Sequence, residues 1–462
     1  MKVKTVNPAT EQVIKEYDII SKENLNESVK KSRTAFETWK KDIKIRSNFL
    51  HDFATELRKR KSDLAKICTT EMGKPLKEAT SEVEKCAWVM EYYADNGETF
   101  LKDEVANADA RKSIIAFEPI GIIGSIMPWN FPYWQAIRFA APSLMAGNTI
   151  VLKPASSTMQ CGLEIEKTFK NIELPDGVFQ TLVGDSKIAE PLIDSDINGV
   201  TFTGSAPVGA IVAQRATSQW KKCVLELGGS DPFIVCDDAD IEKAANGAVK
   251  GRFINGGQSC IASKRFLVVE SVAKEFIKKF LQKVEKLVVG DPMSEATNLG
   301  PLVNETGLKN VDSLVKDAIK NGAELLTGGK QVKKKGFFYE PTVLDKISSK
   351  MRIAHEECFG PVAPITVVPD ERKAIQVAND TVYGLGASIW TGNLEKAEKL
   401  SRMVRSGMVS VNNVLVSDPR VPFGGIKRSG FGRELSRYGM LEFVDIKSIR
   451  YYDELTHNHH VE

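Results

Sequence analysis

The chain has 462 residues, of which 42% are hydrophobic, 8% aromatic and 27% charged. This composition excludes disordered and collagen-like chains, and the length predicts two or three globular domains. The 63 Lys and Arg residues nearly balance the 60 Asp and Glu residues, which leaves a net charge of +3. Such a small charge gives no overall field that would attract nucleic acid or a membrane surface, so we expect neither as a partner.

The cysteine and histidine residues argue against a metal site. The 7 cysteines are scattered and contain no C-x-x-C pair, so a disulfide framework and a structural zinc site are both unexpected. Of the 5 histidines, only His51 and His355 lie outside the last six residues. No histidine-rich metal centre can be built from these two, and we expect His457, His459 and His460 to belong to a frayed end.

The N-terminal segment has no apolar core of the kind that a secretory signal needs. The most apolar stretch, residues 114–146, is interrupted by Glu118, Asn130, Arg138 and several prolines, and is no candidate for a membrane span. We therefore expect a soluble cytoplasmic protein.

The predicted elements are helices first and alternating strands and helices afterwards. Residues 22–100 repeat apolar side chains at three- and four-residue spacing among many Lys and Glu residues, which predicts helices. Beyond them, short apolar runs alternate with helical segments, which indicates βαβ units and a parallel sheet. We expect two strands within 113–128, further strands at 149–153, 178–183, 200–202 and 223–226, and a helix across 157–170. A second such region extends from Asp231 to about Gly430, with strands at 266–269 and 363–368, and 443–453 is again strand-like.

Three residues lie in sequence contexts that suit a catalytic role. Cys260 follows two glycines and small polar residues, which leave its sulfur open to approach; a buried hydrophobic role is the alternative. Glu226 lies between leucines at the end of a predicted buried strand, where burial would raise its pKa towards that of a general base; a structural ion pair is the alternative. Asn130, in P-W-N-F-P, is a rigid amide donor for an oxyanion or completes its own turn.

The segment from Gly204 to Gly209 directly follows a predicted strand. Glycines at such a turn let backbone N–H groups approach a phosphate at a helix N-terminus. The segment is neither a Walker loop nor the G-x-G-x-x-G fingerprint, so taken alone it favours an ordinary helix cap over a phosphate site.

Seven segments occur in the order in which the aldehyde dehydrogenase superfamily has them, and through them essentially the whole chain resembles that family. They are P-W-N-F-P (128–132), K-P-A-S (153–156), F-T-G-S (202–205), L-E-L-G-G (225–229), G-G-Q-S-C (256–260), E-C-F-G-P (357–361) and P-F-G-G-I-K (422–427). Within the superfamily the chain is most similar to bacterial and archaeal succinate-semialdehyde dehydrogenases. This similarity lies in its short length and in the runs 223–235 and 134–138.

The resemblance implies an α/β fold with three parts. Residues 1–105 and 120–228 would form a Rossmann-like cofactor domain, and residues 229–430 an α/β catalytic domain. Residues 106–119 and 440–462 would form a small β arm for oligomerisation. Because such arms pair between subunits in this family, we expect a homodimer or a homotetramer.

The resemblance also assigns the chemistry. Cys260 would attack the aldehyde carbon, and the oxyanion would be held by the Asn130 amide and the Cys260 backbone N–H. After hydride transfer to the nicotinamide, Glu226 would activate the water that hydrolyses the thioester. Because Glu226 is present, a free acid is the expected product rather than a coenzyme A ester.

Further residues match the family's cofactor positions. Gly204 and Ser205 would meet the pyrophosphate, Lys153 and Ser156 the adenine ribose, Glu357 the nicotinamide ribose, and Trp129 and Leu227 the nicotinamide. NAD-specific relatives usually carry a carboxylate at the position of Ser156, which would repel a 2′-phosphate. We therefore expect NADP to be preferred, with NAD possible as a second cofactor, and Lys153 to pair with the phosphate.

The substrate expected from the resemblance is succinate semialdehyde. Its carboxylate needs a polar partner, and Arg138 follows Asn130 by a little over two helical turns, so both can face one tunnel. Ser417 matches a position at which related enzymes bind the same carboxylate. The alternatives are a salt bridge for Arg138, another small aldehyde as substrate, and a non-catalytic structural or binding member of the fold.

Overall fold

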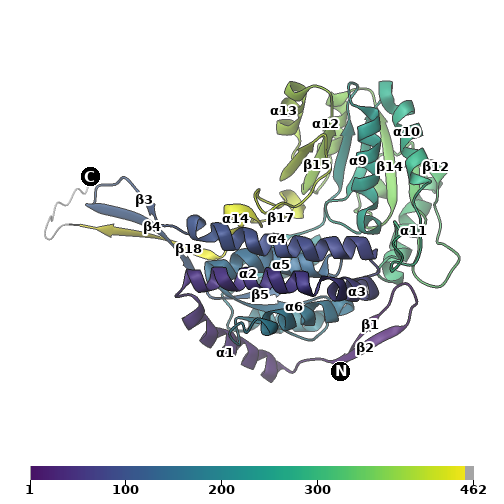
Figure 1. Cartoon of the computed structure of the whole chain (residues 1–462). Helices are drawn as coiled ribbons and strands as arrows, with labels where there is room; N and C mark the ends of the chain where they lie inside the picture. Colours follow the sequence, from purple (N-terminus) through teal and green to yellow (C-terminus); the bar gives the residue numbers. More distant parts are fainter. Residues whose placement is uncertain (1, 453–462) are drawn as a thin grey trace.

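The computed structural model describes residues 2–452 (Figure 1). Its N-terminus is an antiparallel hairpin that the sequence pattern did not predict, made of β1 (Lys2–Val6) and β2 (Val13–Asp18). The helices expected for residues 22–100 follow as α1 (Lys22–Trp39), α2 (Ile43–Lys59), α3 (Lys61–Met72) and α4 (Leu76–Phe100). Helix α3 ends at Gly73, whose φ of 84° is the left-handed conformation typical of a helix C-cap.

A six-stranded sheet with the order β17-β9-β8-β5-β6-β7 carries the first set of motifs. Its parallel strands are β5 (Ile122–Ile126), β6 (Thr149–Lys153), β7 (Phe179–Thr181), β8 (Gly199–Thr203) and β9 (Lys222–Glu226). The short β17 (Gly430–Phe431) pairs antiparallel with β9. The connecting helices are α5 (Pro132–Ala146), α6 (Met159–Asn171), α7 (Ala189–Asp194) and α8 (Ala206–Thr217).

A seven-stranded sheet, with the order β12-β13-β14-β11-β10-β15-β16, forms the second region. Its strands are β10 (Asp231–Val235), β11 (Ser263–Val269), β12 (Glu324–Thr327), β13 (Thr342–Asp345), β14 (Val362–Val368), β15 (Gly386–Trp390) and β16 (Met408–Val411). The accompanying helices are α9 (Ile241–Phe253), α10 (Glu270–Val284), α11 (Glu305–Lys320), α12 (Glu371–Asn379) and α13 (Leu394–Met403). All of its pairings are parallel except that of β12 with β13.

A three-stranded antiparallel sheet projects from the body of the molecule (Figure 1). It consists of β3 (Glu104–Val105), β4 (Lys112–Pro119) and β18 (Val444–Tyr451), and α14 (Ser436–Leu441) precedes β18. The sheet thus begins two residues before the arm boundary expected at residue 106. Residues 453–462 of the expected arm, with its three histidines, lie outside the described residues.

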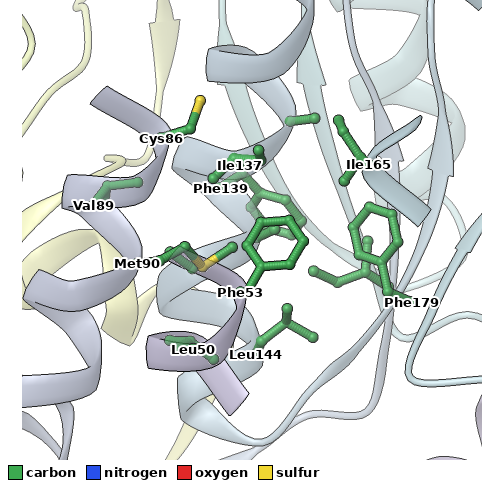
Figure 2. Packing of buried hydrophobic residues seen from close by; sticks show 14 of the residues in the cluster. Leu50, Phe53, Cys86, Val89, Met90, Ile137, Phe139, Leu144, Ile165 and Phe179 are labelled. Atoms are coloured by element: carbon green, nitrogen blue, oxygen red, sulfur yellow. The ribbon is translucent and has the colours of Figure 1, made fainter. Parts of the chain in front are cut away.

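The largest hydrophobic core lies between the first helices and the six-stranded sheet. Figure 2 shows Leu50 and Phe53 of α2 beside Val89 and Met90 of α4 and the side chains of α5. Every residue of α5 is buried, which explains why its sequence reads as a continuous apolar run. This helix begins at Pro132, two residues after Asn130, so the packing of the core restricts the position of that amide.

A carboxylate from α4 caps the buried start of α5. Glu82 Oε1 accepts hydrogen bonds of 2.9 Å from the backbone N–H groups of both Tyr133 and Trp134. Its other oxygen forms an ion pair with Lys74, whose side chain is fully buried. The first N–H groups of a helix have no partner within the helix, and Glu82 supplies one together with a favourable negative charge.

Among the described helices, none combines the length and the apolar character that crossing a membrane would require.

Candidate active site

The parallel register of the six-stranded sheet brings several predicted site residues to one edge. Ile126 at the end of β5 lies opposite both Lys153 and Phe202, and Thr203 lies opposite Glu226. Asn130, Ser156 and Ser205 follow these strand ends closely in the sequence. From β5 the chain continues to β6 and β7 on one side of that strand, and it then crosses to β8 and β9 on the other side. The strand order reverses at this point, and ligands bind at such switch points in open α/β sheets.

The segment before Cys260 is a tight loop in left-handed backbone conformations. Asn255 has φ 52°, and Gly256 and Gly257 follow with φ 62° and 75°. At Gly257 a Cβ atom would lie 2.2 Å from the carbonyl oxygen of Gly360, so only glycine leaves room for that close approach. The glycines predicted as an open path to Cys260 thus also shape the loop.

Hydrogen bonds tie this loop to Asn130. The Asn130 side chain donates from Nδ2 to the carbonyl of Gln258 at 3.1 Å, and Asn255 donates from its own Nδ2 to the carbonyl of Asn130 at 2.8 Å. Asn130 is buried, and this arrangement fixes its amide beside the loop. A side-chain amide carries two N–H donors, so the second one is available to an acceptor near Cys260.

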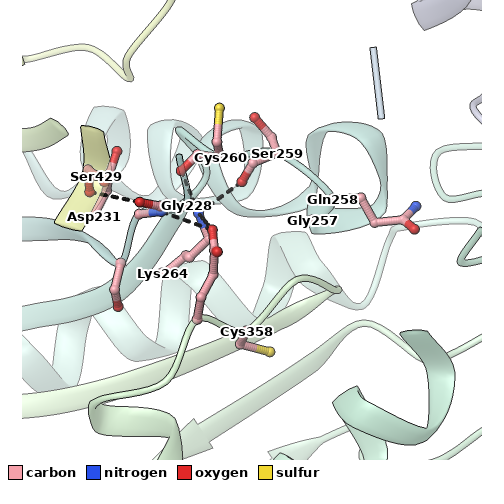
Figure 3. A network of polar contacts seen from close by, with 12 residues as sticks. Gly228, Asp231, Gly257, Gln258, Ser259, Cys260, Lys264, Cys358 and Ser429 are labelled. Carbon is pink, nitrogen blue, oxygen red and sulfur yellow. Dashed lines mark hydrogen bonds and ion pairs between the residues drawn. The ribbon is translucent and has the colours of Figure 1, made fainter. Parts of the chain in front are cut away.

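Lys264 connects the Cys260 loop to Glu357. Its Nζ donates to the carbonyls of Ser259 at 2.9 Å and Cys260 at 2.6 Å, and it lies 3.2 Å from Glu357 Oε1. The same carboxylate oxygen accepts from the backbone N–H of Gly229 at 3.1 Å. Figure 3 shows this network, with the sulfur of Cys260 pointing away from it.

Arg252 is a second buried cation under the same loop. Its side chain is fully buried and donates to the carbonyls of Gly257, Ser263 and Gly360. These bonds join the nucleophile loop to the loop that follows Glu357, so the two segments are held in a fixed relation.

The thiol of Cys260 is protonated at neutral pH in this state. Burial raises the pKa of Cys260 to about 11, although the positive charges of Arg138 and Lys264 act in the opposite direction. Burial alone raises the pKa of Cys223 to about 12. Burial is also the chief reason that the pKa of Cys236 is raised to about 12. Two cations act on Cys260, whereas one, Lys396, acts on Cys236 and none is a cause of the shift at Cys223.

Glu226 is a buried carboxylic acid at the end of β9. Burial is the main reason that its pKa is raised well above the ordinary value, and the neighbouring Glu434 raises it further. Neither of its oxygens has a hydrogen-bond partner among the described residues. Oε1 lies against Gly424, where a Cβ atom would come within 2.6 Å. Such an unpartnered buried carboxyl group fits a base that works on a water molecule.

The residues expected to bind the cofactor fit a ligand that carries phosphates. Ser205 is the N-cap of α8, but its side chain makes no capping hydrogen bond, so the first N–H groups of that helix remain available. Lys153 is 6% exposed, and none of the ion pairs between described residues includes it. Burial lowers its pKa to about 8. Trp129 stacks edge-on against Phe359 at 5.7 Å, beside Glu357.

Cys260 lines a pocket of about 440 Å³ whose walls come from α4, α5, α9 and the loops beside them. Phe131, Trp134 and Phe423 form part of its apolar wall, and Arg138 and Ser417 also line it. The pocket therefore joins the predicted nucleophile to both predicted substrate-binding residues. Asn130 and Glu226 are not among the residues that line it.

Arg138 and Ser417 already have protein partners. Arg138 forms a buried ion pair with Glu434 and lies 4.4 Å from the centroid of the Phe423 ring. The salt bridge that the sequence left open as an alternative is thus present. Ser417 Oγ accepts a 2.7 Å hydrogen bond from Lys85 Nζ.

Sequence reasoning did not identify Lys85, Arg252, Lys264 or Glu434. Lys264 follows Cys260 by four residues, and this proximity was a usable signal. Lys85 lies in a helix rich in Lys and Glu, and Glu434 lies almost 300 residues from its partner, so neither gave a local signal.

A model of the aldehyde dehydrogenase family matches residues 1–449. The chain belongs to the aldehyde dehydrogenase family. A probable succinate-semialdehyde dehydrogenase [NADP(+)] of Synechocystis sp. is 45% identical over 97% of this chain and 99% of its own length. An aldehyde dehydrogenase of Paenarthrobacter nicotinovorans is 41% identical over 97% of this chain and 99% of its own.

The solved aldehyde dehydrogenase structures agree with the fold. Succinic semialdehyde dehydrogenase from Streptococcus pyogenes, in complex with NADP+, matches with a TM-score of 0.95 and 34% identity over 98% of this chain and 100% of its own. The predictions of the family, of its α/β fold and of an NAD(P)-dependent aldehyde dehydrogenase are therefore confirmed.

Proposed function

We propose that this aldehyde dehydrogenase oxidises succinate semialdehyde to succinate, with NADP preferred over NAD. The observation that carries this proposal is one pocket that joins Cys260 to the polar residues Arg138 and Ser417. Arg138 is paired with Glu434 and Ser417 accepts from Lys85, but Arg138 Nη2 has no hydrogen-bond partner among the described residues and the Ser417 hydroxyl can still donate. A carboxylate at the far end of the substrate can accept from both groups, whereas an apolar aldehyde offers no acceptor there. The names of relatives such as the Synechocystis protein support the same substrate.

The first half of the reaction is addition to the aldehyde. The Cys260 thiolate attacks the carbonyl carbon, a C–S bond forms, and the carbonyl electron pair moves onto oxygen. The free N–H of the Asn130 amide and the backbone N–H of Cys260 hold this oxyanion. Because the pKa of the Cys260 thiol is raised, its proton must first leave to solvent, and the positive charges of Arg138 and Lys264 favour the thiolate that remains.

The second half releases the acid. A nicotinamide cofactor held by Lys153, Ser205 and Glu357 would supply the acceptor for the hydride that the thiohemiacetal loses. Glu226 then takes a proton from water, the hydroxide adds to the thioester, and the Cys260 thiolate leaves with the C–S electron pair. A raised pKa is what keeps Glu226 basic enough for this step.

The cofactor preference rests on Ser156 and Lys153. Ser156 begins a short 3₁₀ segment after β6 and carries no charge, so it does not repel a 2′-phosphate. Lys153 ends β6 as a buried cation, which a phosphate would stabilise. Gly204 and Ser205 at the start of α8 would hold the pyrophosphate, Glu357 the nicotinamide ribose, and Trp129 and Leu227 would line the nicotinamide.

We further propose that the domains follow the sheets and that the arm joins subunits. The residue ranges 1–105 with 120–228, 229–430, and 106–119 with 440–462 serve as cofactor domain, catalytic domain and arm. Strand β18 is an edge of its sheet, and Ile446 on it is 62% exposed. Substituting Ile446 by Glu should shift the enzyme from a dimer or tetramer to a smaller species in light scattering, whereas an unchanged mass would show that assembly uses another surface.

A panel of aldehydes assayed with both cofactors tests the function. Succinate semialdehyde should give the highest kcat/KM among aliphatic, amino, phosphorylated and carboxylated aldehydes, and Cys260→Ala should abolish turnover while NADP still binds. A higher kcat/KM for another aldehyde would favour a different hydrolytic dehydrogenase. No NADPH from any aldehyde, in protein that binds NADP, would indicate a non-catalytic role.

A further inference from the structure

The pocket beside Cys260 contains one partly buried cation that the sequence did not identify. Lys85, on the inward side of α4, lines this pocket together with Cys260, Arg138 and Ser417. Its Nζ donates to Ser417 Oγ at 2.7 Å and lies 4.3 Å from the centroid of the Trp134 ring. These two contacts hold the ammonium group at the pocket wall and leave part of its three N–H donors free.

The charges around the pocket differ in whether they are compensated. Arg138 is paired with Glu434, and Glu82 is paired with Lys74. By contrast, no carboxylate among the described residues lies within ion-pair distance of Lys85, and Asp418 nearby is paired with Arg420. Lys77 and Lys250 also line the pocket but are exposed, and Glu78 accepts a hydrogen bond from the Asn255 backbone N–H without an ion-pair partner among the described residues. Lys85 is therefore the partly buried cation of the lining that no carboxylate of the described chain compensates.

The hydrogen bond from Lys85 also orients Ser417. A serine hydroxyl that accepts from an ammonium group directs its own proton elsewhere, so it can donate to an acceptor in the pocket. Lys85 and Ser417 together then offer an N–H and an O–H to two oxygens of one carboxylate. Charge-assisted hydrogen bonds of this kind are stronger than neutral ones.

We propose that Lys85, acting with Ser417, is the principal residue that recognises the carboxylate at the far end of the aldehyde substrate. This inference deepens the proposed function and rests on it. The charge of Arg138 is already balanced by Glu434. Arg138 then shapes the pocket and donates a second hydrogen bond to the substrate carboxylate, but it does not supply the charge that selects a carboxylated aldehyde. Lys85 is thus a specificity residue rather than a participant in bond making.

The proposal predicts a pH dependence that differs between aldehydes. Burial and the neighbouring Arg138 lower the pKa of Lys85 to about 8, so the ammonium group loses its charge as the pH rises above that value. The KM for succinate semialdehyde should therefore rise above pH 8, whereas that for butyraldehyde should not. Glu78, with a pKa raised to about 7 by burial, lines the same pocket, so its negative charge also disfavours a carboxylate as the pH rises. Lys85→Met keeps that contribution, and only the part of the rise in KM that this variant abolishes reports on Lys85. The titrations of Cys260 and Glu226 act on both aldehydes alike.

The experiment compares kcat/KM for succinate semialdehyde and butyraldehyde in the wild type and in Lys85→Met, Lys85→Arg and Lys77→Met. Lys77 is an exposed lysine at the same pocket and serves as the matched control. Lys85→Met should reduce the ratio of the two kcat/KM values at least tenfold, Lys85→Arg should restore much of it, and Lys77→Met should change it less than threefold. Turnover of butyraldehyde shows in each case that the variant is folded.

Two results would overturn the inference. These are an equal loss for both aldehydes in Lys85→Met, and an unchanged preference for succinate semialdehyde. In the second case the proposed function would still stand. Inhibition of butyraldehyde oxidation by succinate separates the two claims. A wild type that does not prefer succinate semialdehyde, yet loses succinate inhibition in Lys85→Met, would overturn the proposed function and retain Lys85 as the carboxylate site.

Discussion

Arg138 and Glu434 form an ion pair between side chains that are only 2% and 3% exposed. The backbone of Glu434 exchanges two hydrogen bonds with that of Phe423, and the Phe423 ring lies against the Arg138 guanidinium. The pair and the ring thus form one unit of the pocket wall. Because α5 carries Arg138 and the C-terminal segment carries Glu434, this unit also joins two distant parts of the chain.

Replacing Arg138 by Met should destabilise the fold. Glu434 would remain buried without its counter-charge, which costs about 3–5 kcal/mol when one partner of a buried pair is removed. Urea unfolding measures this loss. The double variant Arg138→Met/Glu434→Met should recover most of it, because no unpaired charge remains. Equal stability of the wild type and Arg138→Met would mean that the pair contributes nothing to the fold, and would return Arg138 to a role in substrate binding alone.

Replacing Glu82 by Gln should affect the site through α5. The variant removes the charge that pairs with Lys74 and weakens the bonds to the N–H groups of Tyr133 and Trp134. We expect the free energy of unfolding to fall by about 3 kcal/mol and kcat to fall as well, since Asn130 precedes this helix. Glu84, a surface carboxylate on the same helix that pairs with Arg58, supplies the control Glu84→Gln, which should lose less than about 1 kcal/mol.

Much of the fold and of the candidate site could be predicted from the sequence, because the motifs stand at the ends of apolar strands. Glu226 and Lys153 each close a strand, and parallel pairing then brings the strand ends together. The glycines before Cys260 could be read as an open loop, although not their left-handed geometry. The N-terminal hairpin was not predicted, because its strands are polar and largely exposed.

The charge pairs of the pocket could not be predicted for a different reason. Arg138 and Glu434 are joined only by the tertiary fold, and periodicity within either segment says nothing of the other. Lys85 resembles the solvated lysines around it in α4, and only the packing of that helix against Trp134 and Ser417 distinguishes it. Burial of a polar side chain is a property of the fold, so the sequence alone leaves it open.

The raised pKa of Cys260 predicts how alkylation depends on pH. Below a pKa of about 11 the thiolate fraction rises roughly tenfold per pH unit, so inactivation by iodoacetamide should accelerate by about that factor between pH 7 and 8 and again between 8 and 9. Lys264→Met removes a cation that lowers this pKa and should slow the reaction at each pH. Cys358 is buried, so Cys358→Ser should leave the profile unchanged. A rate independent of pH would show that the thiolate is already formed in the resting enzyme.

Replacing Ser156 by Glu should reverse the cofactor preference. A carboxylate at this position would accept hydrogen bonds from the ribose hydroxyls of NAD and would repel the 2′-phosphate of NADP. We expect kcat/KM with NADP to fall by about two orders of magnitude, while kcat/KM with NAD falls little or rises. Steady-state assays with both cofactors measure the change. If the wild type itself has a higher kcat/KM with NAD, the argument from Ser156 is wrong.

Replacing Glu226 by Gln should separate the two halves of the reaction. The amide occupies the same buried volume at the end of β9 but cannot take a proton from water, so the thioester should form and then persist. Rapid mixing with succinate semialdehyde and NADP should show a burst of about one NADPH per active site, followed by a slow steady state. In the wild type, kcat should rise with pH as the raised pKa of Glu226 is approached, and this rise should disappear in the variant. Glu442, a neighbouring carboxylate, provides the control, because Glu442→Gln should turn over without a burst. An unchanged steady rate without a burst in Glu226→Gln would assign the hydrolytic step to another residue.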